Sequence, residues 1–275
     1  MTSPTTQRRM PFKANNHSDK TMNLTFSIII PSYNQGNFIG QTIDSILNQS
    51  YKNVEILVID GGSTDNTIEI LKGYGNRIFW LSEKDRGQTH AINKGIALAK
   101  GNIIAYLNSD DFYLDKTLEI IVDAFTTHEN ALWVTGDYVI VDEEGNKVQN
   151  AIGKYKTYFR NILSFNLLIV LNPIIQPSTF LSRALVDKIG LFNEDLHYVM
   201  DYEYWLKAMK IQHPIIVKNS LSAFRIHKKS KGGSQYRKQF EEELAIARVF
   251  HKGQFLPFLH LLHNKIIYFV YSIIK

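Results

Sequence analysis

The chain has 275 residues, of which 44% are hydrophobic and 12% aromatic, and a formal net charge of +5. It can bury a sizeable core, in one large domain or two small ones, and wholesale disorder, a collagen-like repeat and a multi-span membrane protein are excluded. Because the chain has no cysteine, disulfide scaffolds, thiol catalysis, Cys-ligated zinc and iron–sulfur clusters are excluded as well.

The N-terminal segment is polar and carries no recognisable targeting signal. Residues 1–24 contain two prolines and lack the apolar stretch of a secretory signal peptide. We therefore expect a disordered tail over these residues. Together with the absence of cysteine, this is compatible with a cytoplasmic protein.

From residue 26 onward, short apolar runs alternate with amphipathic segments. Strands are predicted at 26–30, 55–60, 77–82 and 102–107. Helices are predicted between them at 38–50, 68–74 and 90–101. Strands separated by helices of this length indicate right-handed crossovers. The predicted fold class is therefore α/β, with helices flanking a mostly parallel sheet.

Ligands of such sheets bind beyond the C-terminal ends of the strands. The loops at 31–37, 60–67 and 108–113 follow predicted strands and are crowded with small polar or acidic side chains. No GxGxxG motif follows the first strand and no GxxxxGK[ST] motif occurs, which excludes a dinucleotide cofactor and a P-loop. The phosphates of a nucleotide must then be held in another way, most simply by a divalent metal.

Acidic residues end two of the predicted strands. Asp110 and Asp111 follow the fourth strand, and a cation bound to a diphosphate needs only one or two protein carboxylates. This pair is therefore either a Mg²⁺ or Mn²⁺ site or an Asp-rich turn. Asp60 closes the second strand before Gly61 and Gly62. These glycines either let a flat ring approach closely or form a tight turn.

The second half of the chain offers two further candidates. Asp201 begins a segment of helical spacing and lies four residues before Trp205, so the acid and the ring can be neighbours. It is either a general base for an alcohol or an acid that only complements the helix dipole. His227 precedes a Lys/Gly-rich loop and is either a nitrogen ligand of the same metal or an exposed loop residue.

The C-terminal portion is strongly basic. Lys and Arg outnumber Asp and Glu by 13 to 3 in residues 207–275, whereas residues 1–206 contain 18 against 23. Such a portion suggests an anionic membrane or nucleic acid as partner. After Pro257, an apolar stripe and a more polar stripe recur at helical spacing in a segment too short and polar to span a bilayer. It fits a helix in the lipid headgroup region, or one packed on the body or a second copy.

Three segments together resemble the inverting glycosyltransferases of the GT-A fold that are called family 2. They read SIIIPSYNQGNFIGQTIDSILNQSYKNVEILVIDGGSTDNT, EKDRGQTHAINKGIALAKGNIIAYLNSDDFY and the stretch 176–207. The resemblance runs from residue 26 to residue 232, in order and at the usual spacings. It implies a Rossmann-like GT-A domain over 25–232, followed by basic, amphipathic helices over 233–275.

The resemblance also implies roles on the donor side. The nucleotide-sugar would be bound by Pro31, Ser32, Tyr33, Asn34, Asp60, Asp85, Arg86, Lys94 and Asp110. Asp110 and Asp111 match the DXD-type motif, in which Asp111 would bind the metal and Asp110 the ribose or donor sugar. Many relatives have an Asp where Gly61 stands, and that Asp often contacts uracil. Gly61 therefore weakens the case for UDP, although a UDP-sugar remains the expected donor.

On the acceptor side, Gln176 begins a matching loop and Trp205 follows the base. Asp201 matches the catalytic base of the ED motif, with Met200 in place of the Glu. His227 resembles a downstream histidine that completes the Mn²⁺ or Mg²⁺ shell in some members. In the implied mechanism, Asp201 takes the proton of the acceptor hydroxyl while its oxygen attacks the anomeric carbon from the face opposite the nucleotide, which inverts that carbon.

The implied partners are a nucleotide-diphospho-sugar and a glycan or lipid-linked acceptor, with peripheral contact at the inner face of the plasma membrane and no nucleic acid. Two other classes compete with this interpretation. A nucleotidyltransferase would bring a basic Gly-rich loop after the first strand, but PSYNQGN has no Lys or Arg. A non-catalytic nucleotide-sugar-binding protein is disfavoured by the intact acids Asp110, Asp111 and Asp201.

Overall fold

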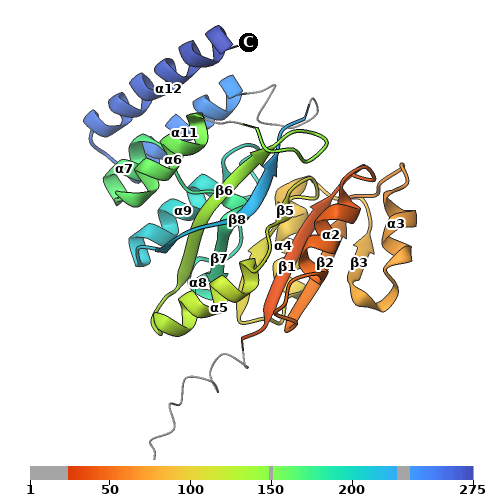
Figure 1. The fold of residues 1–275 in the computed structure, drawn as a ribbon. Helices are drawn as coiled ribbons and strands as arrows, with labels where there is room; N and C mark the ends of the chain where they lie inside the picture. The colour runs from red at the N-terminus through yellow and green to blue at the C-terminus, as the bar shows by residue number, and fades with distance from the viewer. Residues whose placement is uncertain (1–23, 149–150, 228–235, 275) are drawn as a thin grey trace, which may run out of the picture.

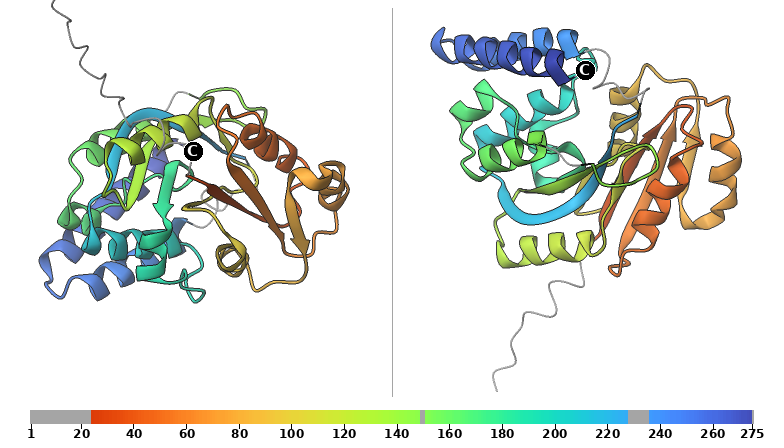
Figure 2. Two further views of the ribbon diagram at one scale, coloured as in Figure 1. Left: turned by 90° about the horizontal axis from the view of Figure 1, so that it is seen from below. Right: turned by 45° about the horizontal axis from the view of Figure 1, so that its top comes forward.

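A computed structural model describes residues 24–148, 151–227 and 236–274 (Figure 1). An open sheet forms its centre, and helices lie on both faces of that sheet (Figure 2). The tail predicted for residues 1–24 falls outside the described residues except for its last residue, and so does the Lys/Gly-rich loop after His227.

Within the described residues, the sheet has eight strands in the order β3-β2-β1-β4-β7-β6-β8-β5. They are β1 (Phe26–Ser32), β2 (Val54–Asp60), β3 (Phe79–Ser82), β4 (Ile103–Tyr106), β5 (Phe112–Tyr113), β6 (Trp133–Val141), β7 (Thr179–Ser182) and β8 (Ile215–Arg225). The first four are the strands predicted from the sequence, and all their pairings are parallel. The predicted α/β class is confirmed.

The helices divide between the two faces. They are α2 (Ile39–Leu47), α3 (Thr67–Gly73), α4 (Gln88–Leu98), α5 (Thr117–Thr127), α6 (Ala151–Asn161), α7 (Phe165–Val170), α8 (Arg183–Ile189), α9 (Met200–Ile211), α11 (Tyr236–Phe250) and α12 (Phe255–Ile274), with short 3₁₀ turns η1 (Gly75–Arg77) and η2 (Gln176–Ser178). One core contains residues of α2, α3 and α5. The other contains residues of α4, α7, α8, α9 and α11.

Strand β1 shows why the sequence folds in this way. All seven of its residues are buried, as expected for a central strand of a parallel sheet covered on both faces. Ile29 enters one core, and Ile28 and Ile30 enter the other, because successive side chains alternate. A Cβ added at Gly95 of α4 would lie 2.4 Å from the Ile29 side chain, so the absent side chain lets α4 pack closely on β1.

The second half of the sheet contains an arrangement that the sequence did not predict. β7 runs antiparallel to both β4 and β6, and β6 pairs in parallel with β8. Two antiparallel steps restore the direction, so β6 and β8 end at the same edge as β4. The chain just before β7, which includes η2, lies at that edge too. The C-terminal ends of β1, β2, β4 and β8 therefore meet there.

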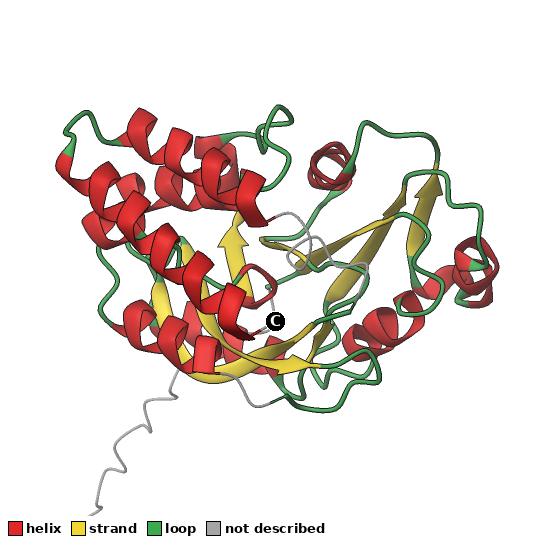
Figure 3. Ribbon diagram, turned by 90° about the horizontal axis from the view of Figure 1, so that it is seen from above, coloured by secondary structure: helices red, strands yellow, loops and turns green. Residues whose placement is uncertain are grey.

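The C-terminal helices pack on the second half of the molecule. Figures 1 and 3 show α11 and α12 gathered with α6 and α7, on the opposite side from β1–β3 and their helices. His260 and Asn264 of the polar stripe of α12 face inward, and His260 Nδ1 lies 2.7 Å from the Ile169 carbonyl oxygen, whereas Tyr268 is exposed. In the parts of the chain that the structure describes, no helix is both long and apolar enough to cross a bilayer.

Candidate active site

Asp60 ends β2 and holds the turn that follows it. Its side chain is buried, and its two oxygens accept hydrogen bonds from the N–H groups of Gly62 (3.0 Å) and Ser63 (2.8 Å) and from the hydroxyls of Ser63 (2.5 Å) and Ser82 (2.7 Å). These four bonds agree with the tight-turn interpretation. The nucleotide-binding role of Asp60 stays a prediction.

The loop after β1 is tied to the loop after β2. Asn34 has a left-handed backbone (φ 53°), its N–H donates to Ser63 Oγ at 2.7 Å, and its Oδ1 accepts from the Thr64 N–H at 2.8 Å. Tyr33 projects outward with 59% of its surface exposed. Pro31 and Ser32 are buried in β1, and Ser32 Oγ has no hydrogen-bond partner among the described residues. The linked residues Asn34, Ser63 and Thr64 form a polar rim along the ends of β1 and β2.

The loop after β3 adds a carboxylate to this rim. Asp85 accepts a hydrogen bond from the Gly87 N–H at 2.8 Å, and a Cβ added at Gly61 would lie 2.8 Å from Asp85 Oδ2. Asp85 therefore fills the space into which a side chain at residue 61 would grow. The two cations predicted beside it are paired, Arg86 with Glu194 at 2.6 Å and Lys94 with Glu83 at 2.5 Å.

Asp110, Asp111 and His227 come together at the end of β4. Asp111 is buried, and its Oδ1 accepts from the Arg225 backbone N–H at 2.9 Å. Burial, with the neighbouring Asp110 charge, raises the pKa of Asp111 well above its ordinary value. Asp110 Oδ2 lies 3.0 Å from His227 Nε2, although 117 residues separate them.

Arg225, which the sequence analysis did not single out, fixes this acidic turn. Its buried guanidinium donates from Nε to the Asp110 carbonyl at 2.9 Å and from NH1 to the Glu143 carbonyl at 2.5 Å. It also lies over the Phe38 and Phe112 rings, 5.1 and 5.4 Å from their centroids. The only sequence signal was an arginine that ends an apolar run two residues before His227.

Gln176 joins the same edge from η2. Its Nε2 donates to the Tyr106 carbonyl at 2.7 Å, and its Oε1 accepts from Asn108 Nδ2 at 3.3 Å. Asn108 also accepts from Gln88 Nε2 at 2.7 Å. A side chain predicted for the acceptor side therefore lies directly beside the end of β4, where Asp111 is held.

Asp201 lies in the first turn of α9, where its Oδ1 accepts from the Tyr202 N–H at 2.7 Å. Burial raises the pKa of Asp201, and the nearby positive charge of Lys156 acts in the opposite direction. The phenol of Tyr106 has a raised pKa because of burial and, in addition, the charges of Asp201 and Asp111. Tyr106 of β4 is therefore within electrostatic reach of both acids.

The structure does not bring Trp205 to the surface of this site. Its indole is 1% exposed and stacks on Trp133, with ring centroids 5.7 Å apart and an interplanar angle of 13°. Helical spacing correctly made it a neighbour of Asp201 along the helix, but the ring belongs to the core between α9 and β6. Its contact with an acceptor stays a prediction that this burial does not favour.

The acids after β4 fit a divalent cation as part of a shared coordination shell. Among residues 24–148, 151–227 and 236–274, no three His, Asp or Glu side chains cluster closely enough to hold a metal by themselves. Asp110 and Asp111 nevertheless bring two hard carboxylates close to the His227 imidazole. A bound cation would relieve the repulsion between the two carboxylates. Such a site suits Mg²⁺ or Mn²⁺ whose remaining ligands are phosphate oxygens and water.

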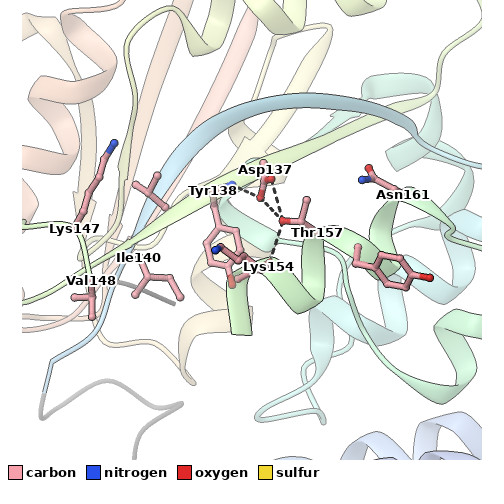
Figure 4. Close-up of a pocket in the computed structure, with 11 residues that line it drawn as sticks. Asp137, Tyr138, Ile140, Lys147, Val148, Lys154, Thr157 and Asn161 are labelled. Atoms are coloured by element: carbon pink, nitrogen blue, oxygen red, sulfur yellow. Dashed lines mark hydrogen bonds between the residues drawn. The ribbon is translucent and has the colours of Figure 1, made fainter. Parts of the chain in front are cut away.

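A separate hollow of about 500 Å³ lies between β6 and α6 (Figure 4). Tyr138, Lys154 and Thr157 are among its lining residues, and Thr157 Oγ1 lies 3.0 Å from both carboxylate oxygens of Asp137. Its lining includes none of the site residues predicted from the sequence. The candidate site is therefore the edge at β1, β2, β4 and α9, and this hollow is distinct from it.

The fold and this edge define the class of protein. The structure matches S. aureus TarS 1-349 in complex with UDP-GlcNAc, with a TM-score of 0.65 and 19% identity over 82% of this chain and 66% of that chain. It also matches the mannosyltransferase PcManGT of Pyrobaculum calidifontis in complex with GDP-Man and Mn²⁺, with a TM-score of 0.65 and 19% identity over 94% and 72% of the two chains. The fold is that of the GT-A glycosyltransferases.

Sequence comparison then identifies the family. The model of Glycosyl transferase family 2 matches residues 27–190, and the chain belongs to this family. It is 32% identical over 204 residues to an uncharacterized glycosyltransferase of Rickettsia prowazekii, covering 72% of this chain and 64% of that protein. It is 31% identical over 188 residues to chondroitin synthase of Escherichia coli, covering 67% of this chain and 26% of that protein. The matches thus span less than two thirds of these relatives.

Proposed function

We propose that this protein transfers a sugar from a nucleotide-diphospho-sugar to an acceptor hydroxyl and inverts the anomeric carbon. The observation that carries the proposal is a link between Asp111 and Asp201 through the start of α4. Asn108 joins Gln88 to Asp111 by hydrogen bonds of 2.7 and 3.4 Å. Thr89, next to Gln88, places its Oγ1 2.6 Å from Sδ of Met200, the neighbour of Asp201. The turn after β4 and the first turn of α9 thus border one region, although 90 residues separate the two acids. A donor diphosphate at the first acid and an acceptor hydroxyl at the second would bring the reacting atoms together.

Asp201 is the proposed general base. Burial raises the pKa of its carboxylate and so makes it a stronger proton acceptor, while the charge of Lys156 favours the ionised form. It takes the hydroxyl proton as the acceptor oxygen bonds to the anomeric carbon. The bond from that carbon to the diphosphate oxygen breaks, and the leaving group keeps the electron pair. A single displacement of this kind inverts the carbon and needs no enzyme nucleophile.

Asp111 and His227, on either side of Asp110, are the proposed ligands of Mn²⁺ or Mg²⁺, and PcManGT, which shares the fold, is in complex with Mn²⁺. The bound metal would offset the negative charge that develops on the departing diphosphate. Arg225 keeps this turn in place, since its backbone and guanidinium hold Asp111 Oδ1 and the Asp110 carbonyl. Asp110 is also the residue proposed to contact the ribose or donor sugar.

The polar rim made by the loops after β1, β2 and β3 is the proposed nucleotide site. Asp85 places a carboxylate against Gly61, where many relatives carry an Asp of their own. The buried hydroxyl of Ser32 has no partner among the described residues and is free to bond to a ligand. A UDP-sugar is the proposed donor. Among proteins with this fold, TarS is in complex with UDP-GlcNAc and PcManGT with GDP-Man.

The test is a substitution of the base with a matched control. In Asp201→Asn, transfer to the acceptor should fall at least about 100-fold because the amide cannot take the proton. Its nucleotide affinity with Mn²⁺ should stay within about twofold, since donor and base contacts are separate. Asp195→Asn, an exposed position six residues earlier, should leave both unchanged. Transfer by Asp201→Asn at the wild-type rate would show that Asp201 is not the general base.

We also propose a glycan or lipid-linked acceptor, with contact between α12 and an anionic bilayer. α12 buries His260 and Asn264 and leaves an apolar face outward, with Phe255, Phe258, Leu262 and Ile266 between 46% and 69% exposed. Exposed cations near this face include Arg248, Lys252 and Lys265. An outward apolar face flanked by cations is typical of a helix that lies in the headgroup region.

Vesicle sedimentation tests the membrane contact. Phosphatidylglycerol vesicles should bind the wild type, and phosphatidylcholine vesicles should bind it less. Phe258→Glu should lose most of this binding because it places a carboxylate on the apolar face of α12. Leu191→Glu changes a similarly exposed apolar residue before α9 and should bind like the wild type. Equal vesicle binding by these two variants would contradict the proposal.

A further inference from the structure

Helix α11 supplies a carboxylate to the segment that leads into α9. Glu242 accepts three hydrogen bonds from consecutive backbone N–H groups, those of His197 at 3.1 Å, Tyr198 at 2.8 Å and Val199 at 3.1 Å. The donors lie 43 to 45 residues before Glu242 in the chain. A carboxylate that accepts several backbone N–H bonds is a strong and directional anchor.

This anchor holds the segment just before α9, whose N-cap residue offers no side-chain cap of its own. Val199 is the N-cap residue of α9, and its apolar side chain makes no capping hydrogen bond. N-cap positions ordinarily carry Ser, Thr, Asp or Asn, which satisfy the free N–H groups of the first turn. Glu242 leaves the N–H groups of the first turn to other partners and binds the Val199 N–H and the two N–H groups before it, which fixes the path of the chain into α9. Asp201 lies two residues further on.

The charge pattern of the C-terminal portion agrees with a dedicated role. Glu241, Glu242 and Glu243 are the only acidic residues in residues 207–275. They differ in their surroundings, because Glu241 is exposed, Glu242 is half-buried and Glu243 is buried. Glu242 is therefore the acid of the three whose carboxylate binds the segment before α9.

We propose that Glu242 is a positioning residue for Asp201, an inference that rests on the proposed role of Asp201 as the base. Without the carboxylate, the three N–H groups lose their acceptor and the first turn of α9 can shift. The Asp201 carboxylate then moves relative to the acceptor hydroxyl. The proposed donor residues lie in or after β1 to β4 and at the end of β8, and none of them accepts or donates in the three hydrogen bonds of Glu242. The loss therefore falls on kcat and spares donor binding.

The kinetic test compares Glu242→Ala, Glu242→Gln and the control Glu241→Gln. A displacement of the order of 1 Å can cost about 100-fold in rate, so kcat of Glu242→Ala should fall at least about tenfold. Glu242→Gln keeps one carbonyl acceptor and should lie between Glu242→Ala and the wild type. The donor KM and the nucleotide Kd should stay within about twofold in all three variants. The control should retain the wild-type kcat.

A second arm does not depend on catalysis. Amide hydrogen exchange at His197, Tyr198 and Val199 should be faster in Glu242→Ala than in Glu241→Gln, with no change at the turn after β4. Unchanged exchange, a kcat within about twofold of the control in both Glu242 variants, or an equal loss of nucleotide affinity would each overturn the proposal. A wild type that transfers no sugar would overturn the proposed function instead, and the exchange difference would still report the anchor.

Discussion

Asp60 and Asp85 in the loops after β2 and β3 are held in place differently from the segment that leads to Asp201. Asp60 is bound by N–H groups two and three residues later, and Asp85 by the N–H two residues later. The segment before Asp201 is held by Glu242, more than 40 residues away along the chain. The loops after β2 and β3 are thus closed largely by their own residues. The acidic turn after β4 and the start of α9 are instead held from distant segments, by Arg225 and by Glu242.

This difference separates two kinds of sensitivity. A turn closed by its own residues keeps its geometry when a distant helix moves, because each bond spans only two or three residues. A helix start held from another element changes whenever that element shifts. We therefore expect changes in α6 and α11 to alter proton transfer, and changes in the loops after β1 to β4 to alter donor binding.

The turn after β4 gives the largest expected effect and the hardest test of this separation. Asp111→Ala removes a buried carboxylate from the proposed metal site, so nucleotide affinity in the presence of Mn²⁺ should fall at least about tenfold. Calorimetry with the nucleoside diphosphate measures it. Asp115→Ala changes an exposed acid four residues later and should bind normally. Equal nucleotide affinities for the two variants would show that Asp111 takes no part in donor binding.

The half of the fold that contains β1 to β4 is also the half that the sequence predicted. The strands at β1 to β4 and the helices between them were found from apolar runs and helical spacing, because both signals are local. The insertion of antiparallel β7 between β4 and β6 was not predicted. Strand order depends on contacts between distant segments, and neither periodicity nor propensity records them.

The candidate site follows the same division. Asp60, Asp110 and Asp111 were found because they end predicted strands, where ligands of α/β sheets bind. Glu242 and Arg225 were missed because their partners lie 43 to 45 and 114 residues away. Such contacts have no signature in a single sequence beyond an unexpected charge: an acid in a basic segment and an arginine at the end of an apolar run.

A smaller effect should appear in the pH dependence of transfer. Lys156 of α6 lowers the pKa of Asp201, against the larger upward effect of burial. In Lys156→Met the pKa of Asp201 should rise, because the stabilising charge is gone while Glu243 and Arg160 remain nearby. The base is then protonated up to a higher pH, so the acidic limb of kcat/KM should move to higher pH, with a several-fold loss of activity at acid pH and an unchanged alkaline plateau.

A pH–rate profile of Lys156→Met beside Lys154→Met measures this shift. Lys154 is exposed on the same helix, so its removal changes the net charge equally without reaching Asp201. Identical acidic limbs in the two variants would mean that α6 does not tune the base. A shift of the acidic limb in Lys156→Met alone would show that α6, like α11, influences Asp201 from a distant part of the chain.

The smallest expected effect is on stability, at the buried carboxylate of Glu243 in α11, which lies 3.8 Å from His260 of α12. Burial raises the pKa of Glu243 from 4.5 to about 7, opposed by the Gln239 hydrogen bond and the charge of Lys156. The folded state therefore binds this proton more tightly than the unfolded state, so the contribution of Glu243 to stability is present below pH 4.5 and is lost as the pH rises through about 7. A neutral amide has no such loss.

Thermal unfolding of Glu243→Gln between pH 5 and pH 8 measures this contribution together with its coupling to His260, which lies 3.8 Å away and whose pKa burial lowers. One pKa unit corresponds to about 1.4 kcal/mol, so Tm of Glu243→Gln relative to the wild type should rise by several degrees across this range. Glu241→Gln should show a constant difference. If the Tm difference between Glu243→Gln and the wild type also stayed constant with pH, ionisation of Glu243 would not destabilise the folded state. The contact of α11 with the segment before α9 would then hold Asp201 through the hydrogen bonds of Glu242, with no part played by buried charge.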